Sequence, residues 1–309
     1  MVSENAEKRG RLFDLYVRQP GHEDITQGRY FCCPLCRRPF EREATAGDIP
    51  LLTLAHIIPE ALGGTWTTLA CADCNNGHGR KVEDDLLASH RFADWVTGRG
   101  TMQVRMGEGG KVRAESRRDP EENHLSFTVT TPMASPAVRV HKQQLATIAE
   151  NPSGGHELKF VLPWFRPGWC WAAVCQSAYL LMFKYFGYDF ARNHRYNFIR
   201  DQIFLPDGAE RAGHILVLPA PIAEQFLEGN QAAVVFVRQP MRAILAVLRF
   251  RSPGGTDQVL AVGMPGPDEP PLTGIDLADA VYSPVSNDPD RMCAHHGSFW
   301  LTWHHWLSL

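Results

Sequence analysis

Two Cys-x-x-Cys pairs constrain the fold of this chain more than any other feature of its sequence. The first pair is Cys33 and Cys36, the second is Cys71 and Cys74, and 34 residues separate Cys36 from Cys71. That length allows the chain to form a hairpin and return, and four thiolates suit a tetrahedral zinc ion. A module of this size has little core of its own, so we expect a structural zinc to contribute much of its folding free energy.

The other half of the eight cysteines has no such spacing. Cys32 is left over beside the first pair, and we expect Cys170, Cys175 and Cys293 to be buried as small hydrophobic side chains. In a cytosolic protein, Cys-x-x-Cys pairs bind metal more often than they form disulfides. A redox protein is therefore a minor alternative.

The residues between the two pairs predict a strand, a turn, a second strand and a helix. Residues 50–58 are rich in apolar and β-branched side chains, Gly63-Gly64 marks a tight reversal, and residues 65–70 return as a strand. From Gly79 to Val96, apolar residues repeat at helical spacing. His56 lies at the end of the first strand.

The rest of the chain mixes helices with short strands. Residues 5–18 predict a helix, and the region from 101 to 165 predicts strands, including residues 137–142. Residues 169–186 are apolar nearly all round, which predicts a helix buried in a core and ending at Gly187. We therefore expect an α+β fold. Its predicted parts are a helix and zinc module (1–98), a β-rich connecting region (99–165) and a C-terminal domain with antiparallel strands (166–309).

Composition and charge limit the classes of function. The hydrophobic content of 44% and charged content of 21% are those of a soluble globular protein, with no apolar run long enough to span a membrane. We expect a cytoplasmic protein without a membrane partner. The net charge of −3 gives no basic excess for nucleic-acid binding. A local basic cluster is either a solvated strand face or a phosphate-contacting surface; it comprises Arg105, Lys111, Arg113, Arg117 and Arg118.

Two stretches of this zinc module carry a family resemblance. AHIIPEALGG (residues 55–64), followed by CADCNNGHGRKVED (residues 71–84), resembles the HNH endonucleases, in the subgroup with two zinc-binding Cys-x-x-Cys pairs. The resemblance covers about residues 30–86. It implies a ββα unit that grips one divalent ion, with a histidine that activates water for phosphodiester hydrolysis.

Carried over by position, the resemblance assigns roles to several residues. His56 would be the general base, and Asn75 would bind a catalytic Mg²⁺ or Mn²⁺ ion. His78 is either a further ligand of that ion or an exposed helix residue. Arg80 and Lys81 are candidates for contacts with DNA phosphates, or belong to a solvated helix face. A histidine has the near-neutral pKa that such a base requires.

The chain departs from the family at Ala55. The family places an acidic residue or a histidine there, directly before the base, as a metal ligand. Either the chain is a naturally weakened variant or it has been inactivated deliberately, and we favour the second explanation. The orienting asparagine of the second strand is also replaced, within Trp66 to Thr68.

We therefore expect a metal-dependent endonuclease that hydrolyses DNA. By analogy, a nuclease joined to an unfamiliar domain fits a bacterial anti-phage defence effector that acts with a regulatory partner or as a homo-oligomer. The alternative is a non-catalytic, zinc-dependent nucleic-acid-binding protein, which Ala55 favours and the retained His56 and Asn75 oppose.

Overall fold

The structure is a computed structural model that describes residues 4–19, 21–47, 49–106, 110–122, 124–132, 134–150, 160–206, 215–237, 243–266 and 294–296. Its helices are α1 (Glu4–Val17), α2 (His22–Thr26), α3 (Arg80–Val96), α4 (Pro136–Glu150), α5 (Pro167–Arg192), α6 (Asn197–Phe204) and α7 (Ala220–Leu227). Short helical turns are η1 (Arg42–Thr45), η2 (Glu60–Leu62), η3 (Asp73–Gly79) and η5 (His194–Tyr196).

The strands in the described part of the chain form four sheets, and the fold is α+β, as predicted. The strands are β1 (Phe31–Cys32), β2 (Pro39–Phe40), β3 (Leu52–His56), β4 (Thr67–Cys71), β5 (Thr101–Met106), β6 (Val112–Asp119), β7 (His124–Val129), β8 (Phe160–Val161), β9 (Ile215–Val217), β10 (Ala232–Val237), β11 (Ala243–Arg251), β12 (Asp257–Pro265) and β13 (Ala294–His296).

The chain packs as two compact units, and each is described here by itself. The first unit contains residues 1–86, 166–251 and 257–309, and the second contains residues 87–165 and 252–256. Segments from both ends of the sequence thus share the first unit. The division into three domains at residues 98 and 165 stays a prediction.

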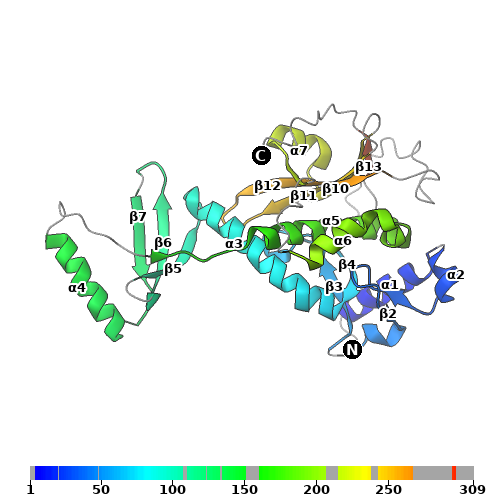
Figure 1. Cartoon of the computed structure of the whole chain (residues 1–309), viewed down its shortest axis with the longest axis horizontal. Coiled ribbons are helices and arrows are strands. Elements are labelled where there is room, and N and C mark those ends of the chain that lie inside the picture. The colour runs from blue at the N-terminus through cyan, green and yellow to red at the C-terminus, as the bar shows by residue number, and fades with distance from the viewer. Residues whose placement is uncertain are drawn as a thin grey trace. The chain divides into compact units, whose positions relative to one another are not determined.

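The first unit is built around a five-stranded sheet with the order β13-β10-β11-β12-β9. All of its pairs are antiparallel except the parallel pair β10 and β13. One face packs against α7 through Ala223, Phe226 and Leu227. The other face meets α5, and Figure 1 shows the two helices on opposite sides of the central strands. Burial on both faces explains why β11 and β12 are continuous apolar runs.

Helix α5 is buried on the side away from the sheet as well. Phe186 contacts Phe236 of the sheet edge to face, whereas Phe183 stacks on Tyr16 of α1 with ring centroids 4.6 Å apart. Two covered sides account for the apolar sequence all round this helix, as predicted. Gly187 has φ 55° and ψ −133°, which breaks the helical path before its last turn. The regular helix therefore ends at Gly187, as predicted, and a further helical turn follows the kink up to Arg192.

The second unit is a four-stranded antiparallel sheet, β7-β6-β5-β8, with α4 packed against it (Figure 1). Its core joins alternate residues of β5 and β6 to Val138 of α4 and Trp95 of α3. The turn after β11 belongs to this unit because Asp94 binds it, at 2.5 Å from Ser252 Oγ and 3.0 Å from Gly254 N. Burial raises the pKa of Asp94, but these hydrogen bonds lower it more.

The strand predicted at residues 137–142 is wrong, because this segment lies in α4. The apolar–polar alternation of AVRVHK is compatible with a strand. However, Val138 and His141 are three residues apart, and both are buried on one side of a helix. Pro136 begins the helix, where its missing N–H costs nothing.

None of the helices in the described part of the chain has the length and apolar character that crossing a membrane requires. Residues 267–293 and 297–309 lie outside the described part of the chain. Cys293 is among these residues. Cys170 and Cys175 are buried, as predicted.

A partly buried polar pair joins α3 to α5 within the first unit. Gln176 Nε2 donates a hydrogen bond of 3.4 Å to Glu83 Oε1. Burial, and then the neighbouring charge of Asp84, raise the pKa of Glu83 from 4.5 to about 7. The folded protein therefore holds this proton more tightly than the unfolded chain does. The contribution to stability is complete below about pH 4 and is lost as the pH rises through 7.

We expect Glu83→Gln to remove this pH dependence, because glutamine stays neutral and can accept the same hydrogen bond. Relative to the unmodified protein, the variant should gain about 1.4 kcal/mol of unfolding free energy between pH 6 and pH 9. Urea unfolding followed by circular dichroism measures it. The exposed control Glu60→Gln should show no such gain, and parallel pH profiles for all three proteins would contradict the assignment.

Candidate functional site

The four cysteines of the two Cys-x-x-Cys pairs come together in the first unit. Cys33 and Cys36 lie on the turn between β1 and β2, Cys71 ends β4, and Cys74 lies in η3. Their sulfur atoms all lie within 4.8 Å of one another, and those of Cys36 and Cys71 are 3.6 Å apart. Tetrahedral zinc with Zn–S bonds of about 2.3 Å needs sulfur atoms about 3.8 Å apart. The donor set therefore fits structural zinc, as predicted.

The surroundings of the cluster favour thiolates. Backbone N–H of Cys71 donates to Cys33 Sγ at 3.4 Å, and Arg38 donates to Cys36 at 3.4 Å and to Cys71 at 3.6 Å. Asp73 holds the same guanidinium at 2.6 Å. Hydrogen bonds among the four cysteines lower the pKa of Cys36 far below its usual range and the pKa of Cys71 to about 6, and they raise the pKa values of Cys33 and Cys74. The bonds from Arg38 and from the Cys71 N–H come from outside this set of thiols. Such outer hydrogen bonds orient metal-bound sulfur and offset its charge.

Cys32 takes no part in the cluster. Its backbone is held instead by Tyr188 of α5, whose hydroxyl donates to Cys32 O at 2.8 Å and accepts from Cys32 N at 2.8 Å. Arg37, in the left-handed conformation with φ 63°, donates to Ala191 O at 3.1 Å. Helix α5 therefore contacts the cysteine-bearing turn directly.

The hairpin of β3 and β4 sets the direction of Ala55 and His56. His56 pairs with Thr67, and Ala55 pairs with Thr68. Ala55 is fully buried on the same face as Thr68, whose hydroxyl bonds Tyr16 at 2.6 Å. Because side chains alternate along a strand, the His56 side chain projects from the opposite face of the hairpin, where it is half-buried. No described residue forms a hydrogen bond with either nitrogen of its ring.

Asn75 is fixed against the strand that carries His56. Its Nδ2 donates to Thr53 Oγ1 at 3.0 Å and to Leu54 O at 3.2 Å. Thr53 and Ala55 share a face of β3, so Asn75 approaches the hairpin on the side of Ala55. In the described part of the chain nothing donates to Asn75 Oδ1, which leaves that oxygen for a metal ion. The residue lies in the π-helical turn η3, a wide turn that often occurs at functional sites.

The remaining predicted site residues differ in their contacts: one is hydrogen-bonded within the protein, and two are exposed. His78 Nε2 bonds Ile203 O at 2.5 Å, and its ring lies 5.1 Å from that of Phe204. The nitrogen must donate to this carbonyl, so Nδ1 is the ring atom that is left for a ligand role. Arg80 and Lys81 are exposed on the first turn of α3. Their roles in metal and DNA binding stay predictions.

Thr67 lies within Trp66 to Thr68, the range in which the resemblance places an orienting asparagine. The backbone bond from Ile57 N to Trp66 O makes His56 and Thr67 a non-hydrogen-bonded pair, in which facing side chains lie closest. Thr67 Oγ1 is buried without a hydrogen-bond partner in the described structure. A hydroxyl beside His56 could orient its ring, but threonine at this position has no recognisable sequence signature.

The turn after β3 depends on Gly64. A Cβ atom on Gly64 would lie 1.7 Å from Ile58 O, so the backbone there admits no side chain. Gly63, at φ 86°, begins the reversal, and its carbonyl accepts a hydrogen bond from Gln231. The predicted Gly-Gly reversal thus brings the chain back into β4 and places Thr67 beside His56.

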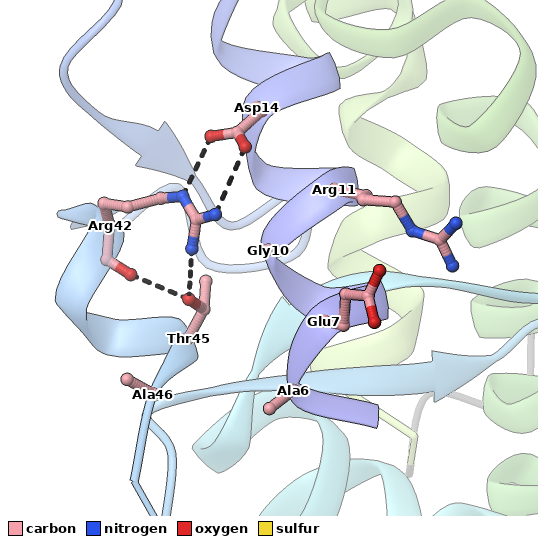
Figure 2. A pocket seen from close by; sticks show the side chains of 8 residues that line it. All are labelled: Ala6, Glu7, Gly10, Arg11, Asp14, Arg42, Thr45 and Ala46. Atoms are coloured by element: carbon pink, nitrogen blue, oxygen red, sulfur yellow. Dashed lines mark hydrogen bonds and ion pairs between the residues drawn. The ribbon is translucent and has the colours of Figure 1, made fainter. Parts of the chain in front are cut away.

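A shallow pocket of about 320 Å³ lies elsewhere in the first unit, between α1 and η1 (Figure 2). Arg42 at its wall donates to both carboxylate oxygens of Asp14, at 2.8 and 3.2 Å, and to Thr45 Oγ1 at 2.8 Å. Gly10 gives this guanidinium room, since a Cβ there would lie 2.7 Å from Arg42 Nη2. The arginine is committed to holding η1 on α1, so we assign no ligand to this pocket.

Comparison with known proteins agrees with this geometry. Residues 33–90 match the model of the HNH endonuclease family, a range that includes the four cysteines, the hairpin and the start of α3. Residues 33–90 therefore match an HNH endonuclease module, and their four-cysteine cluster fits a zinc ion. The comparisons with curated proteins and with solved structures yield no match.

We expect Cys33→Ser to abolish stable zinc binding and to destabilise the protein by more than about 3 kcal/mol, because metal affinity and folding are coupled. Cys32→Ser is the matched control, since the adjacent side chain lies outside the cluster. Metal analysis of purified protein should give one zinc ion per chain for the control and less for Cys33→Ser. Equal zinc content and equal melting temperatures would contradict the assignment.

Proposed function

We propose that the chain is a metal-dependent HNH endonuclease that hydrolyses DNA phosphodiester bonds, with His56 as general base. One observation carries the proposal: Asn75 is tied by its amide nitrogen to Thr53 and Leu54 of β3, the strand that ends at His56, while no described residue donates to its Oδ1. A ligand oxygen and a proton acceptor are thereby carried by one unit of hairpin and helix, in a segment that matches the HNH family.

Each residue has a definite task in this proposal. His56 takes a proton from the water that attacks the phosphorus atom, and its half-buried position on a strand limits its movement. Asn75 Oδ1 and His78 Nδ1 would hold the divalent ion. When bound, Mg²⁺ or Mn²⁺ would neutralise charge on the phosphate and on the leaving oxygen. Arg80 and Lys81 would contact phosphates beside the cut.

Ala55 makes this set of ligands incomplete. Its side chain is on the side that Asn75 approaches, so an acidic residue there would add a charged oxygen ligand to the same site. Without that residue, we propose that the chain has weak or no cleavage activity as it stands. A non-catalytic nucleic-acid-binding protein is the alternative that this position favours. A cytoplasmic location, a protein partner or homo-oligomer, and a role in antiviral defence belong to the same proposal.

We expect Ala55→Glu to cleave plasmid DNA in the presence of Mg²⁺ or Mn²⁺, and the unmodified chain to cleave far less. Adding His56→Ala to that variant should reduce the rate by 10² or more, the usual contribution of a general base. His194→Ala, an exposed histidine of η5, is the control and should leave the rate unchanged. Cleavage that survives His56→Ala would refute its role, and no cleavage by any variant would favour the binding protein.

A second prediction uses stability as its readout. Ala55→Asp places a carboxylate at a fully buried position, which costs several kcal/mol unless a cation lies beside it. The variant should therefore melt at a lower temperature without divalent ions and recover on adding Mn²⁺, because binding to the folded state alone stabilises it. Ala55→Asn has the same shape without charge and should not respond to Mn²⁺. An equal response of both variants would argue against a cation beside position 55.

A further inference from the structure

The sheet of the second unit has one covered and one open face. In β5 the residues Met102, Val104 and Met106 are buried, whereas Thr101, Gln103 and Arg105 between them are exposed. The same alternation continues in β6 and β7. The buried set packs against Val138 of α4, so the other set forms a face of its own. We call this the open face.

The open face carries most of the basic cluster noted in the sequence. Its cations are Arg105, Lys111, Arg113 and Arg117, all exposed. None of the four forms an ion pair with a described residue. Arg118 differs, because it points away and donates to Val96 O at 3.2 Å. Four cations of the cluster therefore form no ion pair with a described residue, whereas Arg118 is hydrogen-bonded within its unit.

The arrangement of these cations is unfavourable for folding. Arg105 and Arg113 are direct cross-strand partners in the β5–β6 register. Like charges that face each other across a sheet are destabilising. Gly110, in the turn before β6, comes within 3.3 Å of the Arg105 side-chain Cβ if given a Cβ of its own, so the turn packs on the stem of that arginine. The charges are held in place although they repel each other.

Among the described residues, the acids of the open face accept hydrogen bonds from groups other than its arginines. Glu115 is the acid between Arg113 and Arg117, and it accepts a hydrogen bond of 3.2 Å from Gln103 rather than from an arginine. Asp119 caps the next turn by accepting from the backbone N–H groups of Glu121 and Glu122, at 3.0 and 3.2 Å. Three of the four cations, Arg105, Lys111 and Arg113, lie at the end of the sheet where β5 leads into β6.

We propose that the open face binds the phosphate backbone of duplex DNA. This inference rests on the proposed function. It adds a DNA-binding surface to the catalytic residues named there. Arginines suit phosphate because the guanidinium donates two parallel hydrogen bonds. Ser126 lies opposite Arg117 and Thr128 lies opposite Glu115, so hydroxyl donors continue the face into β7. A chain with net charge −3 needs such a local concentration of cations to attract DNA.

The test measures DNA affinity without any cleavage, by fluorescence anisotropy of a labelled 20-base-pair duplex over a range of NaCl concentrations. The full chain is compared with the double variant Arg105→Gln, Arg113→Gln. The control double variant Arg139→Gln, Lys142→Gln removes two exposed cations from α4. We expect the first double variant to bind roughly tenfold more weakly, with a salt slope reduced by about 1.8. The control should bind like the unmodified chain.

Stability separates binding from folding in the same experiment. Removing the facing arginines should leave the melting temperature unchanged or raise it, because the repulsion between them is lost. Equal affinity losses in the two double variants would overturn the proposal, and so would an unmodified chain that binds no duplex at 50 mM NaCl. Duplex binding by the Ala55→Glu, His56→Ala variant, which should not cleave, would support the open face independently of the catalytic assignment.

Discussion

Burial of α5 on two sides is the constraint on which the first unit depends. One side completes the five-stranded sheet, where Phe186 meets Phe236, and the other covers the zinc module, where Phe183 stacks on Tyr16. Each large apolar side chain that is fully buried contributes about 1.5–3 kcal/mol. Neither surface could stay closed without the helix. The nuclease module and the C-terminal sheet are therefore parts of one core, and the hydroxyl of Tyr188 extends that core to the cysteine-bearing turn.

Features with a short period or a fixed spacing could be predicted from the sequence. The two Cys-x-x-Cys pairs predicted the cluster because tetrahedral coordination leaves few alternatives, and the apolar run of α5 predicted its burial. The segment beginning at Ala137 was assigned wrongly, since six residues of alternating character fit a strand as well as one side of α4. The partners of α5 could not be predicted either, because no local pattern specifies which surfaces meet across more than a hundred residues.

At the candidate site, the candidate residues could be predicted from the sequence, but the hydrogen bonds that hold them in place could not. The order of motifs singled out His56 and Asn75. The bonds that fix Asn75 reach back to Thr53 and Leu54, and the carbonyl that engages His78 lies 125 residues further on. Such bonds arise from tertiary packing and leave no trace in the neighbouring sequence. For the basic cluster, the strand register was needed to distinguish Arg118, which is hydrogen-bonded within its unit, from the arginines of the open face.

Gly64 shows how strongly a site can depend on a residue that takes no part in the reaction. Any side chain there would collide with the carbonyl of Ile58, in the loop that directly follows His56. Relief of that collision would shift the turn and with it the pairing of His56 and Thr67. Purifying selection should therefore act on this glycine about as strongly as on the zinc ligands. The evolutionary freedom of the module would then be limited by the space inside one turn as much as by the reaction it performs.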